Sequence, residues 1–397
     1  MFGMPRRLLF GYLALAIFMT GDGFELTFLS RFLVENGFTP TQAGLVFTVY
    51  GLVVAISAWT TGVLAEVVGA KRLMVLGGVL WMVLHVLFLT VGLESVVGTI
   101  LIYALRGVAY PLFMYSFVVL IAQSVHPSRL ASAMGWFWAS LPFVAAGTLM
   151  CAFLVPGAPP ETDLSQKLHG AERTRELLRG VTILVENRQI ALSVVIRVLC
   201  NLTLYAFPMM MPLYLTTGEI GGQSWFTLPE WMMLWAIMNT ITIGANIVWG
   251  RLGDRYGWMR QMRWFGFGGM ALAVLAFAYV PVWFGPSFPA MVGAAVLFAL
   301  SVTAFVPMGA IFPALAPEHR GAAISAHNLA SGLTTFLGPG IATLLLPVLG
   351  PIGVCWVFAG LMLLGTLTTF FIHPPQPGLT TEDGRMLPRR DRLAMAA

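Results

Sequence analysis

The feature that most constrains this chain is a series of apolar stretches, each about long enough to cross a lipid bilayer. About 20 apolar residues span the hydrocarbon core as a helix. Only 10% of the 397 residues are charged, compared with about 25% in soluble domains. We therefore expect an all-α membrane protein embedded in the bilayer. The eleven expected spans are Leu8 to Leu29, Thr41 to Ala65, Leu73 to Gly92, Val96 to Ala122, Leu130 to Val155, Ile190 to Leu215, Trp231 to Trp249, Trp264 to Pro281, Phe288 to Phe312, Ala322 to Leu349 and Ile352 to Ile372.

Basic residues lie mainly in alternate loops between these spans, and their placement predicts the orientation of the chain. Lys and Arg are enriched in cytoplasmic loops, so both termini are expected in the cytoplasm. The net charge of +5 is then explained by topology, and no nucleic-acid partner is expected. The inner basic residues are Arg6, Arg7, Lys71, Arg72, Arg129, Arg251, Arg255, Arg260, Arg263 and Arg320, and the first external loop carries Arg31.

This orientation leaves one crossing unaccounted for. The fifth span would end outside near Val155, whereas the span from Ile190 must begin inside. The charged interval between them resembles a cytoplasmic linker, with an amphipathic surface helix from Ala171 to Asn187. A deleted helix, a re-entrant path and an atypical topology are all open. The expected parts are an N-terminal bundle (1–155), a linker (156–189), a C-terminal bundle (190–373) and a cytoplasmic tail (374–397).

Two acidic residues, Asp22 and Glu25, lie inside the first span. Ionisable groups at membrane depth are costly and usually functional. On a helix these two side chains project about 5 to 6 Å apart from one face, so we expect one carboxyl to hold a proton. Arg106, inside the fourth span, is the expected counter-charge. A proton-coupling role predicts that Asp22→Asn abolishes uphill transport, whereas a purely structural ion pair would only hold the helices together.

An internal repeat relates the two halves of the chain. Residues 62–72 and 250–260 both read G-x-L-x-[DE]-x-x-G-x-x-[KR] and follow a span that ends in the cytoplasm. Glycine permits tight turns and close helix approach, and the acid can cap a helix or pair with a nearby arginine. The candidate cytoplasmic gate residues are Gly62, Glu66, Gly69, Arg72, Gly250, Asp254, Arg255 and Gly257.

The duplicated turn resembles the signature loop of the major facilitator superfamily. That resemblance implies two pseudo-repeated helical bundles that rock around a midplane site, here with the usual sixth span absent. It also implies that Glu66 and Asp254 belong to a cytoplasmic latch. More narrowly, the stretches 21–25, 107–117 and 135–138, with Leu45 to Gly51 and Ser57 to Trp59, resemble the ribitol and D-arabinitol permease family. Membership implies proton-coupled import of a polyol by a multi-pass protein of the bacterial inner membrane, with the solute and protons as ligands.

A polyol site needs amide, phenol and indole groups beside aromatic faces, since the solute is uncharged and rich in hydroxyls. For each candidate, interhelical hydrogen bonding is an equal alternative. For His85 and His327, a satisfied packing role is favoured over proton relay. Arg197 is a weaker candidate, because it lies near the cytoplasmic third of its span and could snorkel. The substrate-binding candidates are Tyr110, Trp136, Asn201, Tyr205, Asn239 and Asn328.

Other functions remain as alternatives. A drug antiporter is disfavoured because the segment Ser140 to Gly147 departs from the glycine-proline motif of such proteins, and Arg106 and Arg197 leave a sugar or sugar acid open. A transport-defective remnant or sensor is a further possibility, given the missing crossing. No enzyme motif is present, so catalysis is not expected. No cofactor or metal is expected, because Cys151, Cys200 and Cys355 lack ligand spacing and should be buried thiols, and a monomer is expected.

Overall fold

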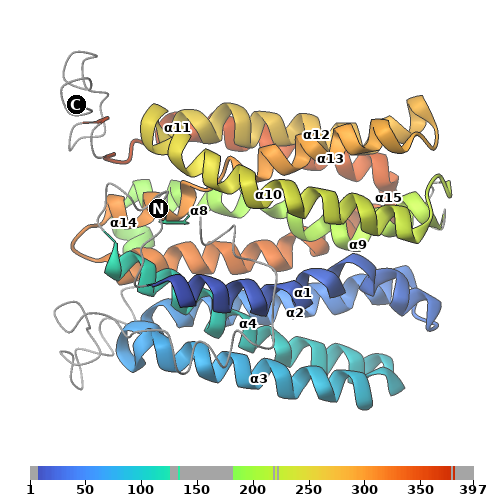
Figure 1. The fold of residues 1–397 in the computed structure, drawn as a ribbon, viewed down its shortest axis with the longest axis horizontal. Coiled ribbons are helices and arrows are strands. Elements are labelled where there is room, and N and C mark those ends of the chain that lie inside the picture. Colours follow the sequence, from blue (N-terminus) through green and yellow to red (C-terminus); the bar gives the residue numbers. More distant parts are fainter. Residues whose placement is uncertain are drawn as a thin grey trace.

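The computed structural model describes residues 8–125, 133–134, 182–217, 220, 223–376 and 379–380. Backbone amides inside a bilayer must be satisfied within the chain, and the described residues are accordingly arranged as a bundle of helices (Figure 1). The helices are α1 (Leu9–Glu35), α2 (Pro40–Leu64), α3 (Ala70–Thr90), α4 (Val96–Ser124), α8 (Arg188–Cys200), α9 (Leu202–Thr216), α10 (Leu228–Tyr256), α11 (Trp258–Gln261), α12 (Gly269–Phe284), α13 (Phe288–Thr303), α14 (Met308–Leu315) and α15 (Arg320–Thr368).

Within the described residues, 8 helical segments are long and apolar enough to cross a membrane. In addition, α1 covers the expected first span. The last two expected spans both lie in α15, where Gly350 interrupts the helix with a φ of 64°. The expected fifth span, apart from Ala133 and Met134, and the linker up to residue 181 lie outside the described residues. Large apolar side chains such as Leu344 and Val348 are 76% and 79% exposed, as expected for a lipid-facing surface.

Several helix starts have local causes that can be read in the sequence. At α10, Thr227 and Glu230 form a capping box in which the Glu230 amide donates to the Thr227 hydroxyl and the Glu230 carboxylate accepts from the Thr227 amide. Asn187 caps α8 and Ser95 caps α4. These side chains satisfy amides that have no partner in the first turn of a helix.

The structure corrects one expected boundary and adds a break inside two of the expected spans, each of which is still long and apolar enough to cross a membrane. Arg31 lies inside α1 and not in the first external loop, since α1 runs on to Glu35. The expected span from Ile190 is divided into α8 and α9 at Asn201. The expected span from Phe288 is divided by the turn 304–307 between α13 and α14. Pro208 and Pro212 lie inside α9. Pro307 directly precedes α14, and Pro313 lies inside it. Each proline removes one backbone hydrogen-bond donor.

The two halves of the chain meet mainly along α2 and the first part of α15. In Figure 1, α1 to α4 (blue to teal) lie below, α10, α12 and α13 (yellow to orange) lie above, and the first part of α15 (orange) runs between them. Small residues permit this contact: a Cβ at Gly62 would lie 2.8 Å from the Cα of Ser325, and one at Gly332 would lie 2.5 Å from the Cα of Ala55. Close packing of this kind replaces the hydrophobic driving force that lipid does not supply.

Candidate functional site

Glu25 and Arg106 form a buried ion pair between α1 and α4. The Arg106 Nη1 donates to Glu25 Oε1 at 2.9 Å, and Nη2 lies 2.8 Å from Oε2. The Arg106 side chain is 0% exposed and the Glu25 side chain is 8% exposed. A two-point contact of this kind fixes both side chains. Removal of either partner would leave the other charge buried, which is strongly unfavourable.

His85 of α3 completes this cluster. Its Nδ1 lies 3.1 Å from Arg106 Nη1 and 3.7 Å from Glu25 Oε2. Because a guanidinium can only donate, His85 accepts through Nδ1 and carries its proton on Nε2. The ring stacks on Trp81 at 4.8 Å, and the Arg106 guanidinium lies 4.7 Å from the Trp81 ring centroid. Through Nδ1, His85 therefore contacts both charges in addition to packing on Trp81.

A second buried polar cluster surrounds Arg197 of α8. Its Nε donates to His327 Nε2 at 3.1 Å, its Nη1 to Cys200 Sγ at 3.1 Å, and its Nη2 to Ser331 Oγ at 2.7 Å. The amide of Asn201, turned so that both of its ends are satisfied, also accepts from Nη1 at 3.1 Å. Arg197 is 2% exposed. Arg197 does not snorkel, because α15 covers it and supplies two of its hydrogen-bond partners.

The orientation of Asn328 in this cluster follows from its neighbours. Since His327 Nε2 accepts from Arg197, the imidazole proton lies on Nδ1 and is donated to Asn328 Oδ1 at 3.2 Å. Asn328 is 0% exposed, and its Nδ2 has no hydrogen-bond partner within the described part of the chain. The candidate Asn328 thus retains a buried donor. His327 is thus a buried histidine whose two ring nitrogens both have hydrogen-bond partners.

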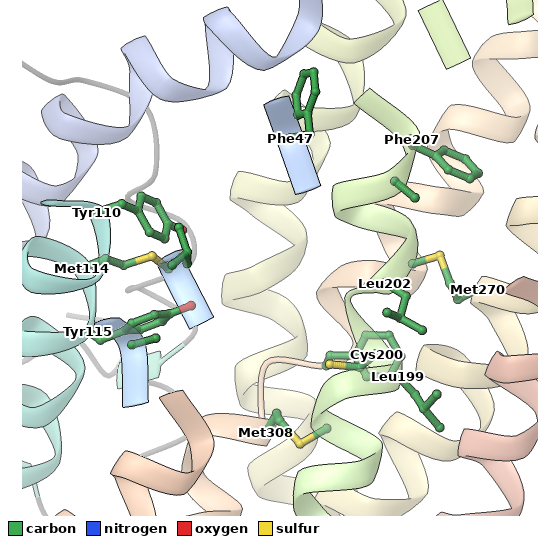
Figure 2. Packing of buried hydrophobic residues seen from close by; sticks show 14 of the residues in the cluster. Phe47, Tyr110, Met114, Tyr115, Leu199, Cys200, Leu202, Phe207, Met270 and Met308 are labelled. Carbon is green, nitrogen blue, oxygen red and sulfur yellow. The ribbon is translucent and has the colours of Figure 1, made fainter. Parts of the chain in front are cut away.

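The remaining substrate candidates are distributed over several environments. Tyr110 is 4% exposed, and its ring meets that of Tyr115 edge-on at 6.2 Å. Figure 2 shows both rings on one side of the view, on α4, and Cys200 and Leu202 on the other side. Asn201 lies at the junction of α8 and α9, one turn before Tyr205. Asn239 is exposed and donates to the carbonyl of its own helix at Trp235, so it joins neither cluster.

Among the proton-coupling and substrate-binding candidates, two lie outside the described side chains. The backbone of Asp22 belongs to α1, but its side chain is not described, and Trp136 lies wholly outside the described residues. Cys200 and Cys355 are free and buried as expected, and Cys151 is also outside the described part.

The two repeated turns have nearly the same backbone. Gly69 has φ 103° and ψ 125°, and Gly257 has φ 110° and ψ 126°, values that favour glycine. These two glycines make the turns. Gly62, Gly250, Asp254 and Arg255 lie in the helices before them and not in loops, and Glu66 belongs to the π-helical turn Ala65–Gly69, with its side chain undescribed. Arg72, in the first turn of α3, is exposed.

The start of the C-terminal tail is hydrogen-bonded to the second of the two repeated turns, the one at Gly257. Gln376 is 5% exposed, accepts from the Trp258 amide at 2.9 Å and donates to the Gly253 carbonyl at 2.9 Å. Asp254 accepts from the Trp258 indole at 3.1 Å. Gln376 thus supplies a partner for the Trp258 amide at the start of α11, where a helix leaves its first amides without partners. It also adds a second donor to the Gly253 carbonyl, which already accepts from the Gly257 amide.

Hydrogen bonds join the two halves near both ends of the long helices. At the end that carries the loop before α2, Ser30 donates to the Pro208 carbonyl at 3.2 Å and Arg31 donates to Thr216 at 2.9 Å. Toward the other end, Ser325 donates to the Trp59 carbonyl at 2.5 Å. A cavity of about 340 Å³ near the first end is lined by Pro40, Thr41, Met209, Ile220, Thr343, Leu346, Pro347 and Gly350.

Sequence reasoning missed four residues that these clusters contain: His85, Ser331, Tyr115 and Cys200. The spacing of Trp81 and His85, and of His327 and Ser331, is four residues in each case, which places each pair on one helix face. This spacing was a usable signal, but only the packing identifies the partners of each face.

Comparison with known proteins agrees with this architecture. The family model described as Major Facilitator Superfamily matches residues 11–143 and 240–394. The chain is 42% identical to a ribitol transporter of Klebsiella pneumoniae, with 96% of this chain and 95% of the relative covered. It is 41% identical to a D-arabinitol transporter of the same species, with 96% of each covered. The resemblance to ribitol and D-arabinitol permeases is thereby confirmed.

More distant relatives have the same fold. An alpha-ketoglutarate permease of Bacillus subtilis (strain 168) is 31% identical, with 93% of this chain and 90% of the relative covered. Crystal structures of the nucleoside transporter NupG and the human organic anion transporter MFSD10 give TM-scores of 0.65 and 0.61 at 16% and 13% identity. Each alignment covers 92% of this chain. It covers 99% of the NupG chain and 100% of the MFSD10 chain. The chain is a multi-pass membrane protein and belongs to the major facilitator superfamily.

Proposed function

We propose that this protein imports a polyol of the ribitol or D-arabinitol type together with protons, by alternating access. The observation that carries the coupling is the buried contact of Glu25 with Arg106 and His85. The solute class rests on the two polyol transporters that are 42% and 41% identical. Asp22, three residues before Glu25, is proposed as the second carboxyl of this proton site.

The chemistry of proton coupling follows from the ion pair. While Glu25 is charged, Arg106 is held by two contacts and the cluster is neutral overall. A proton on Glu25 removes the charge that holds Arg106, so the guanidinium can shift toward His85 Nδ1, which already lies 3.1 Å away. A ligand couples to a conformational change only through different affinities in the two states. Protonation of Glu25 supplies that difference by changing the partners of Arg106.

Alternating access needs contacts between the halves that can open at each end in turn. Ser30 and Arg31 with Pro208 and Thr216 would form one gate. The repeated turns around Gly69 and Gly257, with Asp254 and Glu66, would belong to the other. The long contact between α2 and α15 would act as the axis about which the halves rock.

Solute binding is proposed between α4 of the first half and α8, α9 and α15 of the second. Tyr110 on one side, and Asn201, Tyr205 and Asn328 on the other, supply phenol and amide groups suited to hydroxyls. Asn239 and Trp136 stay in this proposal, although Asn239 lies apart from the two clusters and Trp136 lies outside the described residues.

A carboxylic acid is the second candidate solute. The relative named alpha-ketoglutarate permease is 31% identical, and an arginine such as Arg197 binds carboxylates well. Polyols are favoured because the relatives of higher identity carry them.

We further propose that the protein acts as a monomer in the bacterial inner membrane, with both termini in the cytoplasm. Single cysteines introduced at 160–170 in a cysteine-free background would test the linker. Labelling from the cytoplasmic face alone is expected, and labelling from outside would overturn the orientation.

Transport in proteoliposomes tests the function. With an acidic exterior, labelled ribitol or D-arabinitol should accumulate above its external concentration, and a protonophore should abolish the excess. Unlabelled 2-oxoglutarate serves as competitor. Equilibration without accumulation would overturn proton coupling, and competition by 2-oxoglutarate but not by polyols would favour the acid.

A further inference from the structure

The hydroxyl of Ser331 occupies an unusual position between the two halves. Its Oγ accepts from the Tyr115 phenol of α4 at 2.6 Å and from Arg197 Nη2 of α8 at 2.7 Å. One donor comes from the first half of the chain and one from the second. A single hydroxyl oxygen thus receives two strong donors that approach from opposite sides of the interface.

All members of this arrangement are buried. Tyr115 is 0% exposed, Ser331 1% and Arg197 2%. Donors in such a place need an acceptor in every state of the transporter, because an unsatisfied buried donor costs about 1–3 kcal/mol. When the halves separate, Ser331 cannot remain in contact with both donors.

A further donor lies beside the same position. Asn328 precedes Ser331 by three residues, so both project from one face of α15. The Asn328 Oδ1 is occupied by His327, while its buried Nδ2 has no hydrogen-bond partner within the described residues. The cluster therefore contains one more donor than the described acceptors satisfy.

We propose that Tyr115, Arg197 and Asn328 form a hydroxyl-binding subsite that Ser331 fills in this structure and that a hydroxyl of the solute fills in the loaded state. The subsite would bind a neutral, polyhydroxylated solute, so the inference rests on the proposed polyol function and deepens it. The chemical match is direct, since the serine hydroxyl and a polyol hydroxyl accept hydrogen bonds alike. Ser331 then competes with the solute.

Competition predicts effects of opposite sign on affinity. Ser331→Ala removes the competitor, so equilibrium binding of labelled polyol should tighten about three- to tenfold, as expected for one net hydrogen bond. Tyr115→Phe removes a donor, so binding should weaken by a similar factor. Ser325→Ala is the matched control: it is the same change in the same helix and also removes a hydrogen bond between the halves, to Trp59, but it does not touch the subsite.

The experiment is equilibrium binding of labelled ribitol and D-arabinitol to the purified full-length protein, without a pH gradient. A set of deoxypentitols, each lacking one hydroxyl, is compared on wild type and Tyr115→Phe. One analogue should bind wild type less tightly than the complete pentitol does. This difference in affinity should disappear in Tyr115→Phe, as a direct contact between that hydroxyl and Tyr115 requires.

Each outcome is decisive. If wild type binds neither polyol, the proposed function fails and the subsite fails with it. If wild type binds but Ser331→Ala binds no tighter, only the subsite is overturned. If Ser325→Ala tightens binding as much as Ser331→Ala does, Ser331 is an ordinary interface contact that favours the closed state, and the subsite is again overturned.

Discussion

The hydroxyl of Thr335 in α15 donates to the carbonyl of Gly51 in α2 at 3.1 Å. The backbones of the two helices also approach each other closely at this point. A Cβ at Gly51 would overlap the Thr335 carbonyl. Overpacking of a tight contact forces the backbone to shift. This contact lies near the middle of the surface along which α2 and α15 meet.

Gly51→Leu should therefore separate the halves and remove transport while leaving each bundle folded. We expect uptake below about a tenth of wild type, measured in proteoliposomes with equal amounts of protein. Gly340→Ala is the control, since a Cβ there would lie at an ordinary 3.7 Å from Thr48. Normal uptake by Gly51→Leu would show that the contact is not needed.

Glu25→Gln should uncouple transport from the proton gradient. The amide keeps the shape of the carboxyl but neither carries a charge nor takes up a proton at working pH. Uphill accumulation of polyol should be lost, while exchange of labelled for unlabelled polyol across the membrane should persist. Glu94→Gln, at an exposed acid after α3, should behave as wild type. Accumulation by Glu25→Gln would sink the coupling role.

Arg106→Leu should destabilise the protein through its partner. The Glu25 carboxylate would stay buried without its cation, which costs about 3–5 kcal/mol. The apparent melting temperature in detergent should fall, and the double variant Glu25→Gln with Arg106→Leu should recover part of the loss. If the double variant is no more stable than Arg106→Leu, the ion pair is not the source of the effect.

His85 should oppose protonation of Glu25 in acid. Neutral His85 accepts from Arg106, whereas a second proton on its ring removes the acceptor and places a positive charge beside Arg106. Arg106 is then pushed toward Glu25, so the ion pair is harder to break. His85→Gln retains an acceptor but does not titrate, so its initial uptake rate should match wild type near pH 8 and exceed it near about pH 5. Equal rates at every pH would remove His85 from the coupling.

Gln376→Ala should loosen the turn between α10 and α11. The Trp258 amide and the Gly253 carbonyl would both lose their side-chain partner, and each such loss is worth about 0.5–1.5 kcal/mol. We expect a lower melting temperature and faster proteolysis in this turn. Gln42→Ala provides the comparison: Gln42 is partly exposed in the first turn of α2, and its side chain also accepts from a backbone amide, that of Thr39. Unchanged proteolysis would mean that the tail contributes nothing to the turn.

The sequence alone determined the features that depend on local chemistry. Long apolar stretches can be satisfied in a bilayer only as helices, so most span positions were predictable. The glycines at 69 and 257 were identifiable as turning points because both repeats need a backbone conformation that favours glycine. Arg106 was identifiable as a partner for the acids of the first span because a buried charge requires an opposite one.

Only the tertiary structure decided which faces of the helices meet. In α1, α2 and α9 nearly every side is apolar, so hydrophobic periodicity does not mark the buried face. For that reason the sequence favoured a packing role for His85 and His327, and it left open that Arg197 reaches the membrane surface by snorkelling. Their partners come from α1, α4, α8 and α15, and the contacts depend on how far each helix is rotated about its axis. That rotation is set by packing between helices distant in the sequence, and no local pattern along the chain records it.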